Sequence, residues 1–340
     1  MAGAGAAAGI GVHGFGQGAP FIYFLLGWLF LPVYMSSGVY TMPEYLRERF
    51  GGQRIRVYFS FLSLLLYIFT KISADIYAGA IFIQLALNKT SSEGLWTSIL
   101  ILLAIAALFT ITGGLTAVMW TDFVQVIVMV AGAFVLMGIS FAKVGGYQGL
   151  VEKYPYAIAE IQALDLNNKT CGNPTEDYMK ILRPADSGLP WPGILFGVTI
   201  LAIWYSCTDQ VMVQRTLASK NMTHAKGGCI LVSWLKFLPL WIIIIPGMAS
   251  RILFPDRVGC ADPKQCTIVC GNPNGCSNIA YVELVLTLLP AGLRGVMYSV
   301  MMAALLSSLT SIFNSASTIF TMDLWLLGRK KLSHKEPSQV

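Results

Sequence analysis

The chain has 340 residues, of which 55% are hydrophobic and only 12% charged, about half the charged share of a soluble domain. So much apolar surface cannot be buried in one aqueous globule, which excludes an ordinary soluble protein. The net charge of +6 is modest and gives no reason to expect a nucleic-acid partner. An all-α membrane protein is therefore the predicted fold class.

Seven apolar segments approach or exceed the ~20 residues of a spanning helix. They cover residues 20–41, 57–87, 95–113, 120–142, 191–214, 227–254 and 291–327. A Gly/Ala-rich stretch, residues 1–19, precedes them and resembles the middle of a longer sequence. We expect residues 1–328 to form one transmembrane domain and residues 329–340 a basic, polar tail.

Basic side chains gather after the first, fifth and seventh segments, and seven spans place all three clusters on one side. The positive-inside rule assigns that side, and the tail 329–340, to the cytoplasm. Two sequons, at Asn88 and Asn168, fall on the outer side and are predicted glycosylation sites. A third sequon, at Asn221, falls inside and should stay unmodified.

Four of the seven cysteines crowd into one outer loop: Cys260, Cys266, Cys270 and Cys276. Zinc is the competing interpretation, but the spacing does not match the usual short knuckles and no histidine lies nearby. Disulfides are favoured, with Cys260–Cys266 and Cys270–Cys276 as the local pairing among three possible ones. This leaves Cys171 alone in another outer loop.

Ionisable residues inside the apolar segments usually mark functional sites or structural ion pairs. Lys71 and Asp75 lie one helical turn apart and could neutralise each other. Asp122 opens the fourth segment and Asp209 lies late in the fifth. Lys236, deep in the sixth, needs an acceptor or a wet cavity.

The last segment carries a polar stripe at helical spacing: Ser307, Thr310, Ser311, Asn314, Thr318 and Thr321. Small polar residues let helices pack closely, which is the simpler interpretation. A hydroxyl cluster without water can also bind a hard cation such as Na⁺. The stripe alone favours packing.

Aromatic and hydrogen-bonding side chains adjoin one another in the fifth segment, at Trp204, Tyr205 and Ser206. Such a mixture suits a sugar or polyol, whose C–H faces stack on rings while its hydroxyls need partners. An aromatic belt at the membrane interface is the alternative. No acid, base and nucleophile converge in the sequence, so an enzyme is the least expected class.

Long blocks of the chain resemble the sodium/glucose cotransporter family, that is, the sodium:solute symporter family, solute carrier 5. They are MPEYLR (42–47), YIFTKISAD (67–75), LPWPG (189–193), CTDQVMVQR (207–215), GCSNIAY (275–281) and SLTSIFNS (308–315). The resemblance runs from about residue 3 to residue 325. It implies a LeuT-type inverted repeat of five plus five helices that works by alternating access.

Compared with the family's pattern, the chain is expected to be an incomplete copy of the fold. The first core helix would precede Met1, and the last helices would follow Trp325. The implied activity is sodium-coupled symport of a hexose or related polyol, of the glucose, mannose or myo-inositol class, across the plasma membrane. The implied protein is multi-pass, its small-molecule partners are Na⁺ and the sugar or polyol, and its protein partners are unknown.

The resemblance also assigns roles to single residues. The sodium site would use the Ala304 carbonyl and the Ser307 and Ser308 hydroxyls, with Asp122, Thr310 and Ser311 as further candidates for a second sodium region. In the sugar site Tyr205 and Lys236 match the family, beside Trp204 and Ser206.

Three sugar-site positions depart from the family, which has glutamate at Gly16, threonine at Ala202 and tryptophan at Ser206. Losing a charged acceptor removes about 1.5–3 kcal/mol of hydrogen bonding, so glucose itself is not assured. A sugar-gated sensor or channel without sugar transport is one alternative, and an inactive truncated product is another.

Overall fold

The computed structural model describes residues 1–87, 92–164 and 170–326. Within these ranges the chain is helical apart from connecting segments and two isolated β-bridges, Leu164 with Thr170 and Arg183 with Pro190. Six helices there are long and apolar enough to cross a bilayer, and a bent helix pair makes a seventh span. The predicted all-α architecture with about seven spans is confirmed. The sequons at Asn88 and Asn168 and the tail 329–340 lie outside the described residues.

The first span runs from Ala2 to Ser37, so the Gly/Ala-rich stretch is part of it and the predicted start at residue 20 is wrong. Its pieces are α1 (Ala2–Ala8), the 3₁₀ turn η1 (Gly9–His13), α2 (Gly14–Gln17), α3 (Ala19–Leu25), the π-helical turn η2 (Leu26–Phe30) and α4 (Leu31–Ser37). Small residues explain the low hydropathy signal of its first half. A side chain at Gly3 or Gly5 would collide with the backbone of Ser277 or Ile244, so α1 packs where only glycine fits.

The end of α1 is held by side chains from distant segments. Gly9 ends the helix with φ 70°, a conformation that favours glycine. The Tyr154 hydroxyl donates to the Ala6 carbonyl at 2.9 Å, Arg251 donates to the same oxygen at 3.2 Å, and Arg183 donates to the Ala8 carbonyl. Burial raises the pKa of Tyr154 to about 12, so its hydroxyl keeps its proton and remains a donor. Carbonyls that the break frees therefore have partners.

After α4 the chain turns through α5 (Met42–Phe50) into the second span, which comprises α6 (Gln53–Leu66), the π-helical turn η3 (Tyr67–Ile72) and α7 (Ser73–Leu87). The Thr41 side chain caps α5 and also donates to Asp323 at 3.0 Å. Arg56 lies 2.5 Å from the same carboxylate, and both side chains are buried. The start of the second span is thereby tied to the end of the last one.

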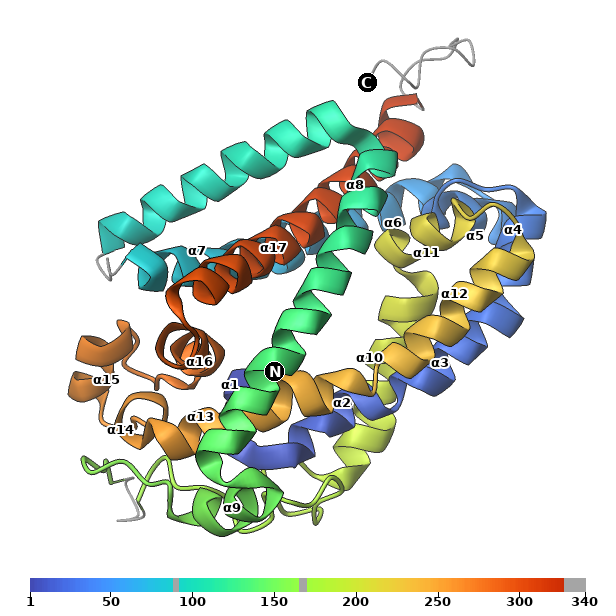
Figure 1. Ribbon diagram of the computed structural model, residues 1–340. Helices are drawn as coiled ribbons and strands as arrows, with labels where there is room; N and C mark the ends of the chain where they lie inside the picture. Colours follow the sequence, from blue (N-terminus) through green and yellow to red (C-terminus); the bar gives the residue numbers. More distant parts are fainter. Residues whose placement is uncertain (88–91, 165–169, 327–340) are drawn as a thin grey trace.

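One continuous helix, α8 (Ser92–Val144), forms two spans because it bends between its limbs, Glu93–Gly113 and Met119–Val144 (Figure 1). The chain then passes through α9 (Gly146–Lys153) and the 3₁₀ turn η4 (Tyr154–Tyr156). The fifth span consists of the π-helical turn η5 (Gly193–Val198), α10 (Thr199–Ile203), the π-helical turn η6 (Trp204–Thr208) and α11 (Gln210–Leu217).

The sixth span is interrupted between α12 (Met222–Leu235) and the π-helical turn η7 (Leu240–Ile244), which leads into α13 (Ile245–Leu253). Pro239 precedes η7 and has no amide hydrogen to donate, which explains the interruption. Short helices α14 (Pro255–Val258) and α15 (Pro263–Cys270), the turn η8 (Ser277–Ile279) and α16 (Ala280–Leu288) follow. The last span is α17 (Ala291–Ile319) with the π-helical turn η9 (Phe320–Trp325).

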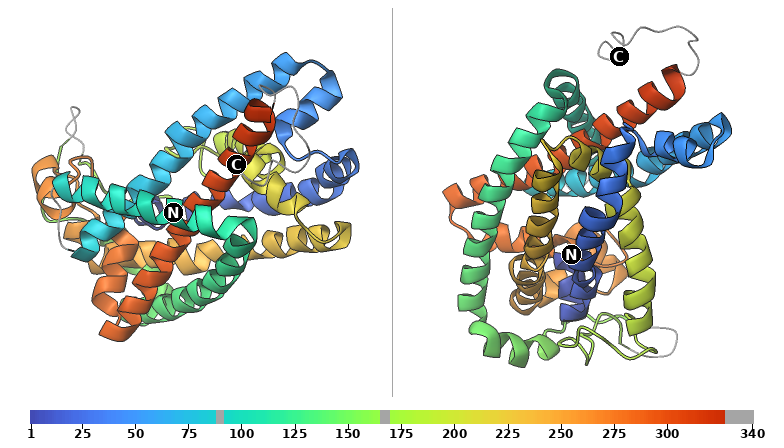
Figure 2. Two further views of the ribbon diagram at one scale, coloured as in Figure 1. Left: turned by 90° about the horizontal axis from the view of Figure 1, so that it is seen from above. Right: turned by 90° about the vertical axis from the view of Figure 1, so that its right-hand side faces the viewer.

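In space α17 packs on α7 and α8, while α12 packs on α3 and α13 on α1. Figure 1 shows α5 and α11 at one end of the molecule and α9, α14 and α15 at the other, and Figure 2 shows the arrangement from two further sides. The described arginines of the basic clusters and the cysteine loop are therefore separated as the sequence predicts. Large apolar side chains point outward, such as Ile111 at 83% and Phe21 at 78% exposure, as lipid contact requires.

Candidate cation and substrate sites

The fifth span breaks at Asp209, where η6 and α11 meet at 43°. The Asp209 side chain accepts a hydrogen bond from the Val211 amide at 3.1 Å and so caps α11. Its other carboxylate oxygen lies 2.5 Å from Nζ of Lys71. Because the two side chains are only 2% and 15% exposed, the break contains a buried charge pair.

The predicted ion pair between Lys71 and Asp75 is wrong, because Lys71 pairs with Asp209 instead. Lys71 lies in the π-helical turn η3, whose wider turn spoils the alignment of residues four apart. The lysine also precedes the acid, which is the weaker order for such a pair in a helix. The ammonium group is thus available to another span.

The Lys71 ammonium faces three aromatic rings, with Nζ 4.5 Å from the ring centre of Tyr67, 5.5 Å from that of Trp204 and 5.1 Å from that of Tyr205. Such distances allow cation–π attraction. Two of the predicted sugar-binding side chains, Trp204 and Tyr205, therefore lie together, and in this structure they contact the lysine of the charged break.

Three predicted sodium ligands also come together, on α8 and α17. One carboxylate oxygen of Asp122 accepts a hydrogen bond from Ser307, and the other lies 2.8 Å from the guanidinium of Arg215. The same guanidinium donates to Ser311. Arg215 thus supplies positive charge among the oxygen atoms that were predicted to hold a cation.

Sequence reasoning missed the role of Arg215 and assigned it only to a cytoplasmic cluster. Arg215 lies on the short helix α11, which follows the break at Asp209. Half-helices at a break often carry site residues, so a residue at this place was a candidate for the site. The neighbouring Gln214 bonds Thr318 at 3.2 Å and Ser315 at 3.0 Å. Hence α11 satisfies part of the polar stripe, and helix packing explains that part.

The remaining predicted sodium ligands, Ala304, Ser308 and Thr310, lie on the same stretch of α17. The Ser308 hydroxyl is 3.2 Å from the Ala304 carbonyl oxygen, a separation that lets two oxygens contact one small cation at about 2.4 Å each. The Thr310 hydroxyl donates to the Ser307 carbonyl at 3.0 Å and is buried, so it is turned to its own helix.

A cavity of about 410 Å³ connects these groups. Its lining comes from the second, fifth and last spans and includes Thr70, Lys71, Asp75, Tyr205, Arg215, Ser307, Ser308 and Ser311. Lys71 of the first charge cluster, Arg215 of the second and the serines of the polar stripe therefore border one space between the spans. Transporters with discontinuous helices bind their substrates and ions in such a space.

The structure separates the predicted substrate residues into two groups. Tyr205 lines the cavity, whereas Ser206 is buried on the opposite side of η6, in contact with the Tyr23 hydroxyl. The Nζ of Lys236 lies 5.9 Å from the ring centre of Tyr23, the residue that Ser206 contacts. The four residues thus do not form one contact cluster in this conformation.

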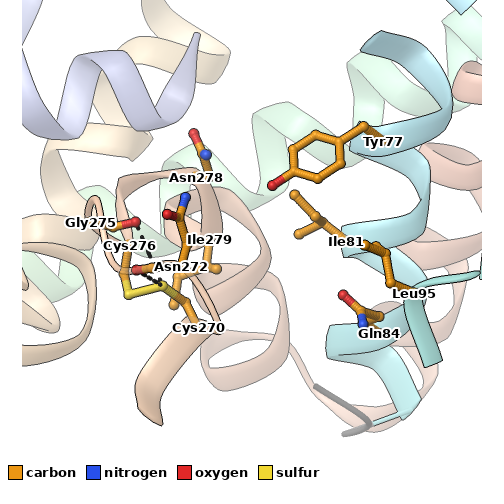
Figure 3. A pocket seen from close by; sticks show the side chains of 11 residues that line it. Tyr77, Ile81, Gln84, Leu95, Cys270, Asn272, Gly275, Cys276, Asn278 and Ile279 are labelled. Carbon is orange, nitrogen blue, oxygen red and sulfur yellow. Dashed lines mark hydrogen bonds between the residues drawn. A yellow bond between two sulfur atoms is a disulfide. The ribbon is translucent and has the colours of Figure 1, made fainter. Parts of the chain in front are cut away.

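At the cysteine-rich end the structure has disulfides Cys260–Cys266 and Cys270–Cys276, while Cys171 is a free, half-buried thiol. Figure 3 shows the second disulfide beside a cavity of about 200 Å³, with Tyr77, Ile81 and Gln84 of α7 facing the loop that carries Asn272 and Asn278. The loop thereby covers the adjacent end of α7.

The sodium:solute symporter family model matches residues 1–340. The chain is 58% identical to sodium/myo-inositol cotransporter 2 of Bos taurus over 337 residues, 99% of this chain and 49% of that protein. It is 56% identical to sodium/glucose cotransporter 4 of Danio rerio over 337 residues, 99% of this chain and 50% of the relative. Sodium/glucose cotransporter 1 of Ovis aries is also 56% identical, over 339 residues, with 99% and 50% covered. The chain spans about half the length of the curated relatives it matches.

Among solved structures, a Na⁺-coupled sialic acid symporter in its substrate-bound, outward-open state matches with a TM-score of 0.74 at 20% identity, covering 99% of this chain and 65% of that one. The fold and the broken spans are those of a multi-pass membrane protein of the LeuT type, as predicted. The chain belongs to the sodium:solute symporter family, a family of transporters rather than enzymes, in which Na⁺ is a co-substrate.

Proposed function

We propose that the protein couples the entry of Na⁺ to the uptake of a hexose or related polyol, of the glucose, mannose or myo-inositol class, across the plasma membrane. The observation that carries this proposal is identity of 56–58%, along nearly the whole chain, to cotransporters named for myo-inositol and for glucose. The single transmembrane domain over residues 1–328 is the part that would do this work.

Sodium would bind along α17. Ser308 and the Ala304 carbonyl supply neutral oxygens, and Asp122 with Ser307 and Ser311 supplies a charged second position, with Thr310 as a supporting ligand after a side-chain rotation. Hard cations prefer such oxygen ligands. Arg215 holds the charged position in this conformation, so Na⁺ and the guanidinium compete for Asp122.

The sugar or polyol would bind among the first, fifth and sixth spans, where Tyr23 meets Ser206 and Lys236. Tyr205 and Trp204 offer ring faces for its C–H groups, and Lys236 and Ser206 offer hydrogen bonds. Opening and closing at the breaks of these two spans would provide alternating access. The membrane potential adds about 2.3 kcal/mol per entering charge per 100 mV.

Uptake of labelled glucose, mannose and myo-inositol tests the proposal, with Na⁺ or choline outside cells that express the protein from its gene. We expect accumulation of at least one substrate in Na⁺ and loss of it in choline. Surface biotinylation checks delivery to the plasma membrane. Equal uptake in both salts would contradict sodium coupling.

A sugar-gated sensor is the second candidate, and the altered positions Gly16, Ala202 and Ser206 favour it. It would pass sodium current when sugar binds, without moving the sugar. Voltage-clamp recording combined with label uptake in the same cells separates the candidates, since a sugar-evoked current without accumulation of label favours the sensor.

A further inference from the structure

Two spans lose regular helix at the same level of the molecule. The first is interrupted at η1 (Gly9–His13), and the sixth between Leu235 and η7. The two interruptions are in contact, since η1 packs on η7. Irregular backbone at membrane depth is tolerated where it lies in protein or lines a polar cavity, so a pair of facing breaks marks a place built for polar groups.

A histidine side chain ends η1 at this place. His13 is only 3% exposed, and its Nδ1 is buried without a hydrogen-bond partner in the described part of the chain. Buried nitrogen atoms of this kind are almost always paired in folded proteins. The unpaired Nδ1 therefore points to a partner that arrives from outside the chain.

Space for that partner exists beside Gly16. A Cβ built there would lie 3.8 Å from Nδ1 of His13 and 4.0 Å from the Lys236 carbonyl oxygen, so the glycine leaves a position free between the two breaks. The adjacent residues Gly14 and Phe15 line a cavity of about 490 Å³ together with Ala202.

The second break contributes a polar atom at the same position, the carbonyl oxygen of Lys236. Lys236 ends α12 at the second break and its ammonium has Tyr23 as its neighbour, with no acid paired to it in the described residues. Two polar atoms thus face the position beside Gly16, the Nδ1 of His13 and the main-chain carbonyl oxygen of Lys236, and a hydroxyl group can hydrogen-bond to both.

We propose that His13 is a specificity-determining residue, whose Nδ1 hydrogen-bonds one hydroxyl of the bound sugar or polyol beside Gly16. The proposal rests on the proposed function for the substrate class. The carbonyl oxygen of Lys236 accepts a hydrogen bond from a second hydroxyl, and the absence of a side chain at Gly16 lets the ring approach the histidine.

Three substitutions at residue 13 separate hydrogen bonding from packing. His13→Leu removes the nitrogen, His13→Asn places an amide atom where Nδ1 lies, and His13→Gln places one nearer to Nε2. We expect the dissociation constant of the purified protein for tritiated glucose, mannose or myo-inositol, whichever of the three it binds, to rise about tenfold in the leucine variant, as for the loss of one hydrogen bond. Asparagine should restore most of the affinity and glutamine should not. His224→Leu, at the far end of α12, is the matched control.

Monodeoxy analogues of the same substrate identify the contact. One analogue should bind the wild-type protein about tenfold more weakly than the parent and should lose nothing further in His13→Leu, since the partner is already absent. A uniform loss across all analogues, or unchanged binding in the leucine variant, would overturn the proposal. Binding without Na⁺-dependent uptake would contradict the proposed symport and leave the histidine contact standing, whereas no binding of any hexose or polyol would overturn both.

Discussion

Single side chains on α17 decide whether the polar stripe binds a cation or only packs. Ser315 and Thr318 hydrogen-bond Gln214 of α11, which supports packing along that part. Ser308 is different because it lines the cavity, and among the described residues its hydroxyl hydrogen-bonds a carbonyl of its own helix, that of Ala304. The two interpretations of the stripe therefore apply to different residues.

Replacing Ser308 with alanine should raise the Na⁺ concentration for half-maximal uptake about tenfold, since one ligand of roughly 1.4 kcal/mol is removed. Sodium titration of uptake measures this change. Ser299→Ala is the control, because that hydroxyl makes the same kind of bond, to Gly295 at 3.0 Å, on an exposed face. A shift in the control as large as in Ser308→Ala would mean that the effect is helical rather than a ligand loss.

Helices and their breaks account for what the sequence predicts well and badly. Apolar length predicts the spans from residue 53 onward, because Leu, Ile and Phe dominate them. It misses Ala2–Ala8, whose glycines serve close packing and carry little hydropathy. It also misses the partner of Lys71, since helical spacing assumes an α-helix where the chain forms a π-helical turn. Clustering of Asp122 with Ser307 and Ser311 follows from the family pattern, but Arg215 in their midst depends on tertiary packing.

The charge pair across the break in the fifth span should behave as a unit. Lys71→Met alone leaves Asp209 buried and unpaired, which should cost about 3–5 kcal/mol of stability. Asp209→Asn alone keeps the cap of α11 but leaves the Lys71 ammonium without its negatively charged partner. The double variant should recover most of the loss. Thermal unfolding in detergent measures the cycle, and additive losses in the double variant would show that the two charges act independently.

At the scale of the whole molecule, the sequence predicts which end faces which side. Basic residues gather at the end of α5 and α11, and the disulfide loop at the end of α14 and α15 (Figure 1). Asn221, at the basic end, caps α12 by accepting a hydrogen bond from the His224 amide at 3.0 Å. That residue therefore has a structural role independent of any glycan.

Glycosidase treatment tests this orientation. Removing the sequons at Asn88 and Asn168 should each take away one glycan, because both are predicted to face outward, while Asn221→Gln should leave the glycan pattern unchanged. Gel mobility before and after deglycosylation gives the measurement. Loss of a glycan in Asn221→Gln would reverse the assigned sides.

The disulfide that borders the cavity in Figure 3 should stabilise the outer end. Closing so short a loop is worth about 2 kcal/mol in the chain-entropy account. Changing Cys270 and Cys276 together to serine should lower the unfolding temperature and raise the rate at which a water-soluble reagent labels Tyr77→Cys, since that position of α7 lines the cavity beside the disulfide. Cys171→Ser, which removes a free thiol, is the control and should change neither quantity.

The side chains that hold the end of α1 have a consequence for how this chain can vary between species. Tyr154, Arg183 and Arg251 bind main-chain oxygens, which every residue type possesses. Selection on residues 2–8 therefore acts on size and hardly on chemistry. A complete substitution scan should find that alanine and serine replace each other freely at the positions of this segment that have room for a Cβ. Every residue larger than glycine should fail at Gly3 and Gly5. Tyr154, Arg183 and Arg251 should tolerate almost no substitution.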